Sequence, residues 1–382
     1  MENASAAIIA RAAAAARAQD TATAAAGGAD DTHAAEAFRR LYPAAFLKRF
    51  LRQGVRPDGR RPAACRPATI ALGALSRAAA AGSALARLSS TPGSSGPRIV
   101  GGTAALAGVR LEVMCPTDEA PDRGGLAVSV EFAPLASPAG EGSRAADQAC
   151  AAVIAERLRE LLLGGGGRGG GATSSCAGPP PLVDTRQLCI DPGRAAWAAY
   201  LDVVVLDASG SAADACLLAA LAALGDARLP RVRVTGEGNV EREEGEEGEE
   251  EEMEADGRRL SLRGGAALPA SSTTFAACRL PPTQQQQAAE EDDGGGNDDS
   301  GVVLLADPTA EEEAVAQALV TVTVDEEAVL GVAVAPGGGG GGGGDALLLR
   351  PAALLRCTAL ARARGRELGK QLEAAAKQQA GS

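Results

Sequence analysis

The stretch from residue 188 to residue 224 constrains the fold of this chain more than any other. Residues 197–206 are rich in aromatic and β-branched side chains, which is typical of a buried strand. Residues 207–210 are of types that are common in turns, and the Ala/Leu-rich run 211–224 favours a helix. A helix this apolar must be covered on most sides. The stretch therefore predicts a strand, a turn and a helix inside a layered domain.

The two ends of this predicted helix carry residues that are common at helix ends. Ser211 can cap the first turn through its side-chain oxygen. Gly225 stands where a residue in the left-handed conformation often ends a helix. Whether the turn before Ser211 is a working site is the main functional question.

Six low-complexity tracts are not expected to contribute to a core, because they lack the apolar side chains that offset the entropy cost of ordering. Roughly 250 residues remain, enough for one or two compact units. Arg11 and Arg17 suit a targeting peptide, but the acids around them favour a disordered or loosely helical extension. The tracts are an Ala-rich extension (1–37), a flexible Gly-rich loop (164–187), a disordered acidic insertion (236–257), two loops (284–300 and 337–344) and a tail (373–382).

The net charge of −12 is unevenly distributed along the 382 residues. Residues 237–256 carry twelve acids and one arginine, and residues 290–299 carry six acids. Without these 17 net negative charges the rest of the chain stands at +5. The remaining chain is mildly basic, so local contact with RNA or phosphate is allowed, although no long Lys/Arg block favours strong nonspecific binding.

Cysteine and histidine usage excludes several classes of site. None of the eight cysteines forms a CxxC pair, and several lie in apolar runs, which predicts buried thiols in a reducing compartment. His33 is the only histidine, so the chain holds no Ser/His/Asp triad, Cys/His dyad or multi-histidine metal site. We expect no cofactor and no metal. The apolar runs near 201–224 are interrupted by turn residues and acids, so we expect a soluble chain.

The remaining segments predict two similar α/β halves with mixed sheets. In the first half (38–235), a helix begins near Pro43, RPDGR at 56–60 forms a turn, and a second helix covers 145–163 with Ala149, Val153, Ile154, Leu158 and Leu161 inward. The RPDGR arginines can meet RNA or pair with nearby acids, and we favour a structural role. Strands are expected at 67–73, 84–88, 103–113, 126–132 and 229–234.

The second half (258–372) contains further strands and one long closing helix. Strands are expected at 258–263, 272–278 and 301–306, followed by a hairpin over 319–335 that turns near Glu326. Residues 347–372 predict a long amphipathic helix with a basic face. The pattern lacks regular βαβ spacing, so a doubly wound parallel sheet is not expected.

Five motifs in register resemble the RNase PH family from about residue 38 to 372, outside the insertions. They are RPDGR (56–60), GSALARL (82–88), GGTAALAGVR (101–110), APDRG (120–124) and DPTAEEE (307–313). The resemblance implies two βαβ-type halves and a place in the hetero-hexameric ring of an RNA exosome. It also implies other RNase PH-like subunits, cap subunits with RNA-binding domains and a separate 3′–5′ nuclease as partners. Single-stranded RNA would pass through the ring. The resemblance implies no membrane partner and a location in the nucleus, nucleolus and cytoplasm.

The resemblance also implies which residues to compare with a catalytic site. Catalytic members hold phosphate with a Gly-Thr/Ser-Arg turn and use a pair of aspartates for the metal or proton. The matching turn here is Gly210, Ser211, Ala212, without arginine, and Asp214 would repel an anion. Asp307 matches the first aspartate, but Glu313 replaces the second.

We therefore expect a noncatalytic ring subunit that scaffolds the ring and guides RNA. Taken alone, the acidic cluster at 307–313 is typical of a solvated helix start. Family members line their channel with basic residues on the helix after the strand block, which implies Arg144, Arg157 and Arg159 here, although a solvated helix face also explains them. The alternatives are a phosphate-dependent 3′–5′ exoribonuclease and a diverged member that makes only protein contacts.

Overall fold

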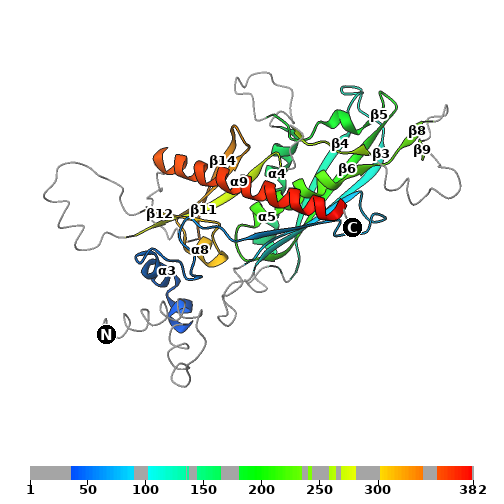
Figure 1. Cartoon of the computed structure of the whole chain (residues 1–382). Helices are drawn as coiled ribbons and strands as arrows, with labels where there is room; N and C mark the ends of the chain where they lie inside the picture. Colours follow the sequence, from blue (N-terminus) through cyan, green and yellow to red (C-terminus); the bar gives the residue numbers. More distant parts are fainter. Residues whose placement is uncertain are drawn as a thin grey trace, which may run out of the picture.

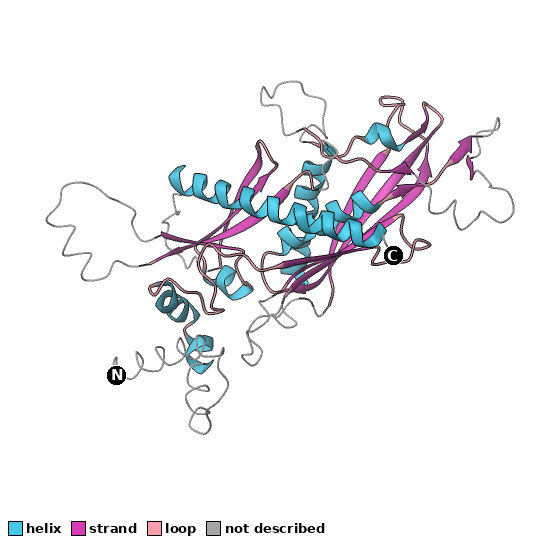
Figure 2. Ribbon diagram, in the orientation of Figure 1, coloured by secondary structure: helices cyan, strands magenta, loops and turns pink. Residues whose placement is uncertain are grey.

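Two β-sheets, with helices between and across them, make up most of the structure (Figure 1). Runs of two or more strands are each followed by a helix along the chain. Figure 2 shows both kinds of element, as expected for an α/β fold. The structure is a computed structural model. It describes residues 36–89, 102–134, 136, 144–164, 180–234, 240–242, 258–263, 268–280, 302–338 and 351–380.

The first sheet is mixed, as predicted. Its strands lie in the order β1-β2-β3-β6-β4, and all neighbours are antiparallel except β4, which runs parallel to β6. A short strand, β5 (Cys189–Asp191), pairs with the start of β6. The main strands are β1 (Ala68–Leu72), β2 (Gly82–Leu88), β3 (Thr103–Met114), β4 (Gly125–Phe132) and β6 (Ala195–Ala208), so the predicted strands of this sheet are confirmed.

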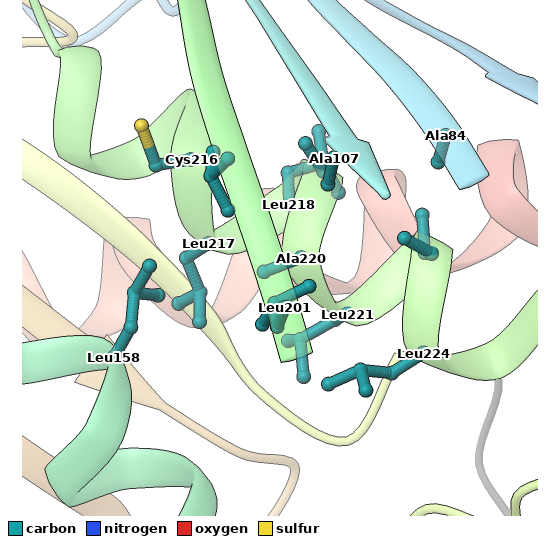
Figure 3. Packing of buried hydrophobic residues seen from close by; sticks show 14 of the residues in the cluster. Ala84, Ala107, Leu158, Leu201, Cys216, Leu217, Leu218, Ala220, Leu221 and Leu224 are labelled. Atoms are coloured by element: carbon teal, nitrogen blue, oxygen red, sulfur yellow. The ribbon is translucent and has the colours of Figure 1, made fainter. Parts of the chain in front are cut away.

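Helix α5 (Ala212–Asp226) is the centre of the molecule. It contacts β2 and β3 of the first sheet on one side and β11 of the second sheet on another. Leu217, Leu218 and Leu221 lie among side chains from the first sheet and from α4, and all three are buried (Figure 3). This two-sided cover explains why the helix is apolar all round and confirms the prediction that it is enclosed.

The predicted caps of α5 are wrong, although the helix itself is confirmed. Ser211 occupies the N-cap position with φ of 53°, but its side chain caps no backbone amide of the helix. Gly225 lies inside the helix, which ends at Ala227 in an extended conformation. Contacts with the second half fix the first end of α5, and β7 (Arg228–Leu229) continues the chain directly from the other end.

The second sheet is fully antiparallel, in the order β12-β11-β13-β14. The predicted hairpin is confirmed, because β13 and β14 pair across residues 325–328. The sheet's inner face holds Phe275, Val320 and Val322 in a separate apolar cluster. Its strands are β11 (Ser271–Arg279), β12 (Val302–Ala306), β13 (Ala318–Val324) and β14 (Val329–Pro336).

Helix α9 (Pro351–Ala380) crosses both sheets and contacts β1, β11 and β13 (Figure 1). The sequence placed its end at Leu372 and a tail after it, and this boundary is wrong. The last turns are held to the first half, because the Gln379 side-chain amide donates to Asp226 Oδ1 at 3.1 Å. Buried Asp226 also accepts a hydrogen bond from Arg77, at 2.9 Å.

Two further helices flank the core, and the inward face predicted for α4 is confirmed at Ile154 and Leu158 but wrong at Ala149 and Val153. Helix α3 (Pro43–Leu51) begins at the predicted proline and buries Leu47, Phe50 and Leu51. In α4 (Arg144–Leu163), Ala149 and Val153 are exposed. The buried face of α4 consists of Ala151, Ile154, Leu158 and Leu162.

Three predicted boundaries also change. Residues 182 and 183, placed in the Gly-rich loop, are buried and lead into a short 3₁₀ helix, Thr185–Leu188. Part of the acidic insertion forms strand β9 (Val240–Arg242), which pairs with β8 (Val232–Val234). Strand β10 (Arg258–Arg259) pairs with β7, so this segment belongs to the first half.

Residues 1–35 of the predicted N-terminal extension and most of the predicted insertions lie outside the described residues. Among the helices that the structure describes, none combines the length and the apolar character needed to cross a membrane.

Candidate functional site

The turn between β6 and α5 packs directly against the segment that begins at Asp307. The amide of Ala310 donates to the carbonyl of Ser209 at 3.1 Å, and Ser211 Oγ donates to the carbonyl of Pro308 at 3.2 Å. Gly210 has φ of +98°, and a Cβ at that position would lie 2.6 Å from the nitrogen of Ala310. The structure therefore brings together the two motifs that the sequence singled out, and only glycine fits between them.

One backbone amide of the turn donates a hydrogen bond to a side-chain carboxyl group of this same chain. The backbone N–H of Ser211 donates to Glu313 Oε1 at 2.7 Å. Glu313 comes from α8 (Ala310–Val315), a short helix of the second half. Backbone amides at the start of a helix are the groups that hold phosphate in anion sites. Here the bonded anion is the chain's own side chain, and Ala212 and Ala213 add no positive charge.

Asp214 does not face an open anion site. Its carboxylate accepts hydrogen bonds from Ser272 Oγ at 2.6 Å and from the amide of Thr274 at 2.7 Å. Both donors belong to β11, so Asp214 ties the first turn of α5 to the second sheet. Burial raises the pKa of Asp214 to about 6, although these hydrogen bonds act in the opposite direction.

Glu313 is a second carboxyl with a raised pKa. Burial raises the pKa of Glu313 to about 7, and the negative charges of Asp214 and Asp307 act in the same direction. The hydrogen bond from Ser211 and the positive charge of Arg66 only partly oppose this shift. The surroundings of Glu313 therefore favour the neutral carboxyl more than water does.

Asp307 is held by a buried arginine that the sequence analysis did not single out. Arg66 Nη2 lies 2.6 Å from Asp307 Oδ1, and Arg66 Nε lies 2.9 Å from Oδ2. The same guanidinium donates to the carbonyl of Gly210 at 3.0 Å. Burial alone would raise the pKa of Asp307, but the hydrogen bonds and charge of Arg66 outweigh it, so the pKa lies below its usual value.

The interpretation of residues 307–313 as a solvated helix start is wrong for its main members. Asp307 and Glu312 are buried, and only Glu311 is well exposed. Thr309 and Glu312 form a capping box at the start of α8, in which the amide of Thr309 donates to Glu312 Oε2 at 2.8 Å. The T-x-x-E spacing could have revealed this cap from the sequence.

The RPDGR turn has the structural role that the sequence analysis favoured. Arg56 is fully buried, and its Nε donates to Glu312 Oε1 at 2.9 Å. Its Nη1 donates to the carbonyl of Ala306 at 2.7 Å. Arg60 pairs with Asp58 at 2.6 Å. These arginines join the N-terminal segment to the second half, so they are committed to internal partners.

The arginines expected to meet RNA lie on α4, away from this ionic cluster. Arg144 is the first residue of α4, and its side chain lies outside the described part of the structure. Arg159 pairs with Glu156 on the same helix. Arg157 is half-buried and acts electrostatically on Cys150, whose pKa is raised first by burial and then by Glu313. Of the two arginines whose side chains the structure describes, Arg159 is thus paired within α4 and Arg157 lies near Cys150.

Within the described ranges, no group of three or more His, Cys, Asp and Glu side chains has a geometry that could hold a metal ion. The site consists of the turn and first residues of α5 together with the segment 307–313, and hydrogen bonds join the two. Its chemistry is hydrogen bonding from arginines and backbone amides to buried and half-buried carboxyl groups.

The fold is that of a two-sheet α/β protein. Domain 1 of the 3′ exoribonuclease family, RNase PH, matches residues 64–230, and domain 2 of that family matches residues 297–364. The chain belongs to this RNase PH family. The first match covers the turn at 210–212, and the second covers the segment 307–313 that meets it.

Similar proteins include exosome components from archaea. The exosome complex component Rrp42 of Sulfurisphaera tokodaii is 35% identical over 189 residues, which is 49% of this chain and 57% of that protein. Rrp42 of Saccharolobus solfataricus is 33% identical over 182 residues, covering 47% and 54%. The chain therefore spans just over half the length of the curated relatives it matches.

Solved structures support the fold over a longer part of the chain. A chain of the Archaeoglobus fulgidus exosome with RNA bound to the active site gives a TM-score of 0.55 at 22% identity. That similarity covers 86% of this chain and 96% of the other. An archaeal exosome core gives a TM-score of 0.53 at 21% identity. The α/β fold with RNase PH-like halves is confirmed.

Proposed function

We propose that this chain is a noncatalytic ring subunit of an RNA exosome, which scaffolds the ring and guides RNA toward a separate 3′–5′ nuclease. The single observation that supports this most is the hydrogen bond from the Ser211 amide to Glu313. The turn that would hold phosphate bonds a carboxylate of the same chain instead. Its processes would be 3′–5′ RNA processing and degradation, including ribosomal RNA maturation and messenger RNA turnover.

The charges around the turn argue against phosphate binding. A charge-assisted hydrogen bond contributes about 1.5–3 kcal/mol, and the turn has no arginine to make one. Arg66 reaches the turn, but its guanidinium bonds the carbonyl of Gly210 and the carboxylate of Asp307. Phosphate would have to displace Glu313 and approach Asp214. We infer that this turn serves as a joint between the halves.

The names of the similar proteins support membership of a multi-subunit exosome ring. The relatives and the solved structures are described as exosome components and exosome cores. The partners would be other RNase PH-like subunits in a hetero-hexameric ring, cap subunits, a nuclease and single-stranded RNA, in nucleus, nucleolus and cytoplasm. Residues 188–216 most resemble the subunit called ribosomal RNA-processing protein 43, while the matched relatives are named Rrp42. The particular subunit therefore stays a prediction.

The ring assignment is tested by purifying the tagged chain from its own cells at low salt. We expect it to elute in a complex that contains other RNase PH-like chains, identified by mass spectrometry. A free monomer without such chains would contradict ring membership.

The same purified complex tests the role of α4 in guiding RNA. A variant with Arg157→Glu and Arg159→Glu should shorten the RNA segment that the complex protects from an added nuclease, because the reversed charges repel phosphate. The matched control is Arg123→Glu with Arg194→Glu, which reverses two exposed arginines outside α4. Equal protection by both variants would exclude a specific role for α4.

A further inference from the structure

Two short strands after α5 place three arginines side by side at the surface. Strand β7 pairs antiparallel with β10, and the register sets Arg228 directly opposite Arg259. Residues directly opposite each other in such a pair share one face, with Cβ atoms about 4.5–5.5 Å apart. Arg259 and its neighbour Arg258 are exposed, and Arg228 is half-buried. Because like charges at this spacing repel each other, this arrangement favours a bound anion.

Backbone hydrogen bonds and buried leucines hold this pair of strands in place. The amide of Arg228 donates to the carbonyl of Ala81, and the amide of Leu260 donates to the carbonyl of Ala227, each at 3.0 Å. Leu229 and Leu260 are buried in the main apolar cluster. The arginines therefore extend from a fixed support, so that binding a ligand there requires little ordering of the backbone.

Among the described residues, no acid compensates these three arginines. The side chains of Arg228 and Arg259 make no ion pair or hydrogen bond there, and the buried Nε of Arg228 has no acceptor. Arg258 donates to a backbone carbonyl, which leaves its charge uncompensated. Asp226, two positions before Arg228, is buried and already paired with Arg77 at 2.9 Å. By contrast, the buried arginines at the junction of the halves are all bonded to carboxylates.

We propose that Arg228, Arg258 and Arg259 form an arginine patch that binds phosphate groups of single-stranded RNA. A guanidinium group presents parallel N–H donors that match two oxygens of one phosphate, and such charge-assisted hydrogen bonds are stronger than neutral ones. Basic side chains that follow the phosphates of a single strand bind it without reading its sequence. The choice of RNA as the source of the phosphates rests on the proposed function, whereas the site itself rests on the uncompensated arginines. The patch lies on different elements from the arginines of α4.

The experiment measures binding of a labelled single-stranded RNA oligonucleotide to the full chain by fluorescence anisotropy, between about 50 and 200 mM salt. Each phosphate contact contributes about −0.7 to the slope of log affinity against log salt concentration. The double variant Arg228→Gln, Arg259→Gln should bind at least about tenfold more weakly and lower the magnitude of the slope by about 1.4, because two contacts are lost. The matched control Arg356→Gln, Arg366→Gln removes two exposed arginines of α9 and should leave the slope unchanged.

A second arm distinguishes RNA from free phosphate. Millimolar inorganic phosphate, compared with chloride at equal ionic strength, should leave most of the RNA bound, because several phosphates of one strand act together. Displacement of most of the RNA would assign the patch to free phosphate and overturn the proposal.

Three further outcomes would also contradict the arginine patch. They are a wild type that binds no RNA at the lowest salt, a double variant that keeps the wild-type affinity and slope, and a control that loses as much as the double variant. The first would leave the arginines to another anion, such as the acids at 243–256 of the same chain. If the double variant does not fold, Arg259→Gln at an exposed position decides: the slope should fall by about 0.7, and an unchanged slope would overturn the proposal. Such a failure leaves ring membership standing, because co-purification tests that separately.

Discussion

Replacing Arg66 by methionine is expected to lower the free energy of unfolding by about 3 kcal/mol, because the buried Asp307 then keeps only the longer ion pair with Arg60, at 3.3 Å. The Arg66 side chain is almost completely buried and donates to both oxygens of Asp307. It also donates to the carbonyls of Ser209 and Gly210. The change is measured by urea unfolding at pH 7, followed by circular dichroism.

Two comparisons show whether the lost charge partner causes this effect. Arg194→Met removes an exposed ion pair with Asp191 and should change stability by less than about 0.5 kcal/mol. Adding Asp307→Asn to Arg66→Met should restore part of the loss, because the poorly compensated buried charge is removed. If the double variant is no more stable than Arg66→Met, lost packing rather than the buried carboxylate explains the result.

Replacing Gly210 by alanine is expected to cost about 3 kcal/mol or more, through backbone strain and overpacking together. The residue has φ of +98°, and a Cβ would meet rigid backbone, with the Ala310 nitrogen and the Thr309 carbonyl carbon each 2.6 Å away. The added methyl would push the α5 turn away from α8 and separate Ser211 from Glu313. Unfolding in urea at pH 7 measures the loss.

Gly193→Ala is the matched control, because it separates strain from contact. Gly193 has φ of +76°, but nothing lies within 4 Å of its added Cβ. It should therefore lose only about 1 kcal/mol, from the left-handed conformation. Equal losses at both glycines would mean that the close approach of the two motifs contributes no stability.

The strands and helices were largely predictable from local patterns. The buried strand around Leu201 and the apolar helix that follows it depend on the order of residue types, which a single sequence contains. Boundaries were less predictable where distant contacts fix them. Gln379 extends α9 because it reaches Asp226, and Gly225 stays helical because neighbouring helix residues are enclosed.

The residues of the site were predicted from the sequence, but the hydrogen bonds between them were not. The sequence identified Gly210, Ser211, Asp307 and Glu313, and the structure brings all four together. The sequence did not reveal that Glu313 bonds the turn, because the two residues are 102 positions apart. Arg66 was missed for the same reason, since its partner Asp307 is 241 positions away.

Phosphorolysis measures the central proposal most directly. The purified full chain, alone and within its complex, is incubated with end-labelled RNA and inorganic phosphate, and released nucleoside diphosphates are separated by chromatography. In the complex, Glu313→Ala in this chain alone shows whether any product comes from this turn, because the other subunits are unchanged. We predict no nucleoside diphosphate from the isolated chain and no effect of Glu313→Ala on the product formed by the complex. Phosphate-dependent release of nucleoside diphosphates by the isolated chain would contradict the noncatalytic account.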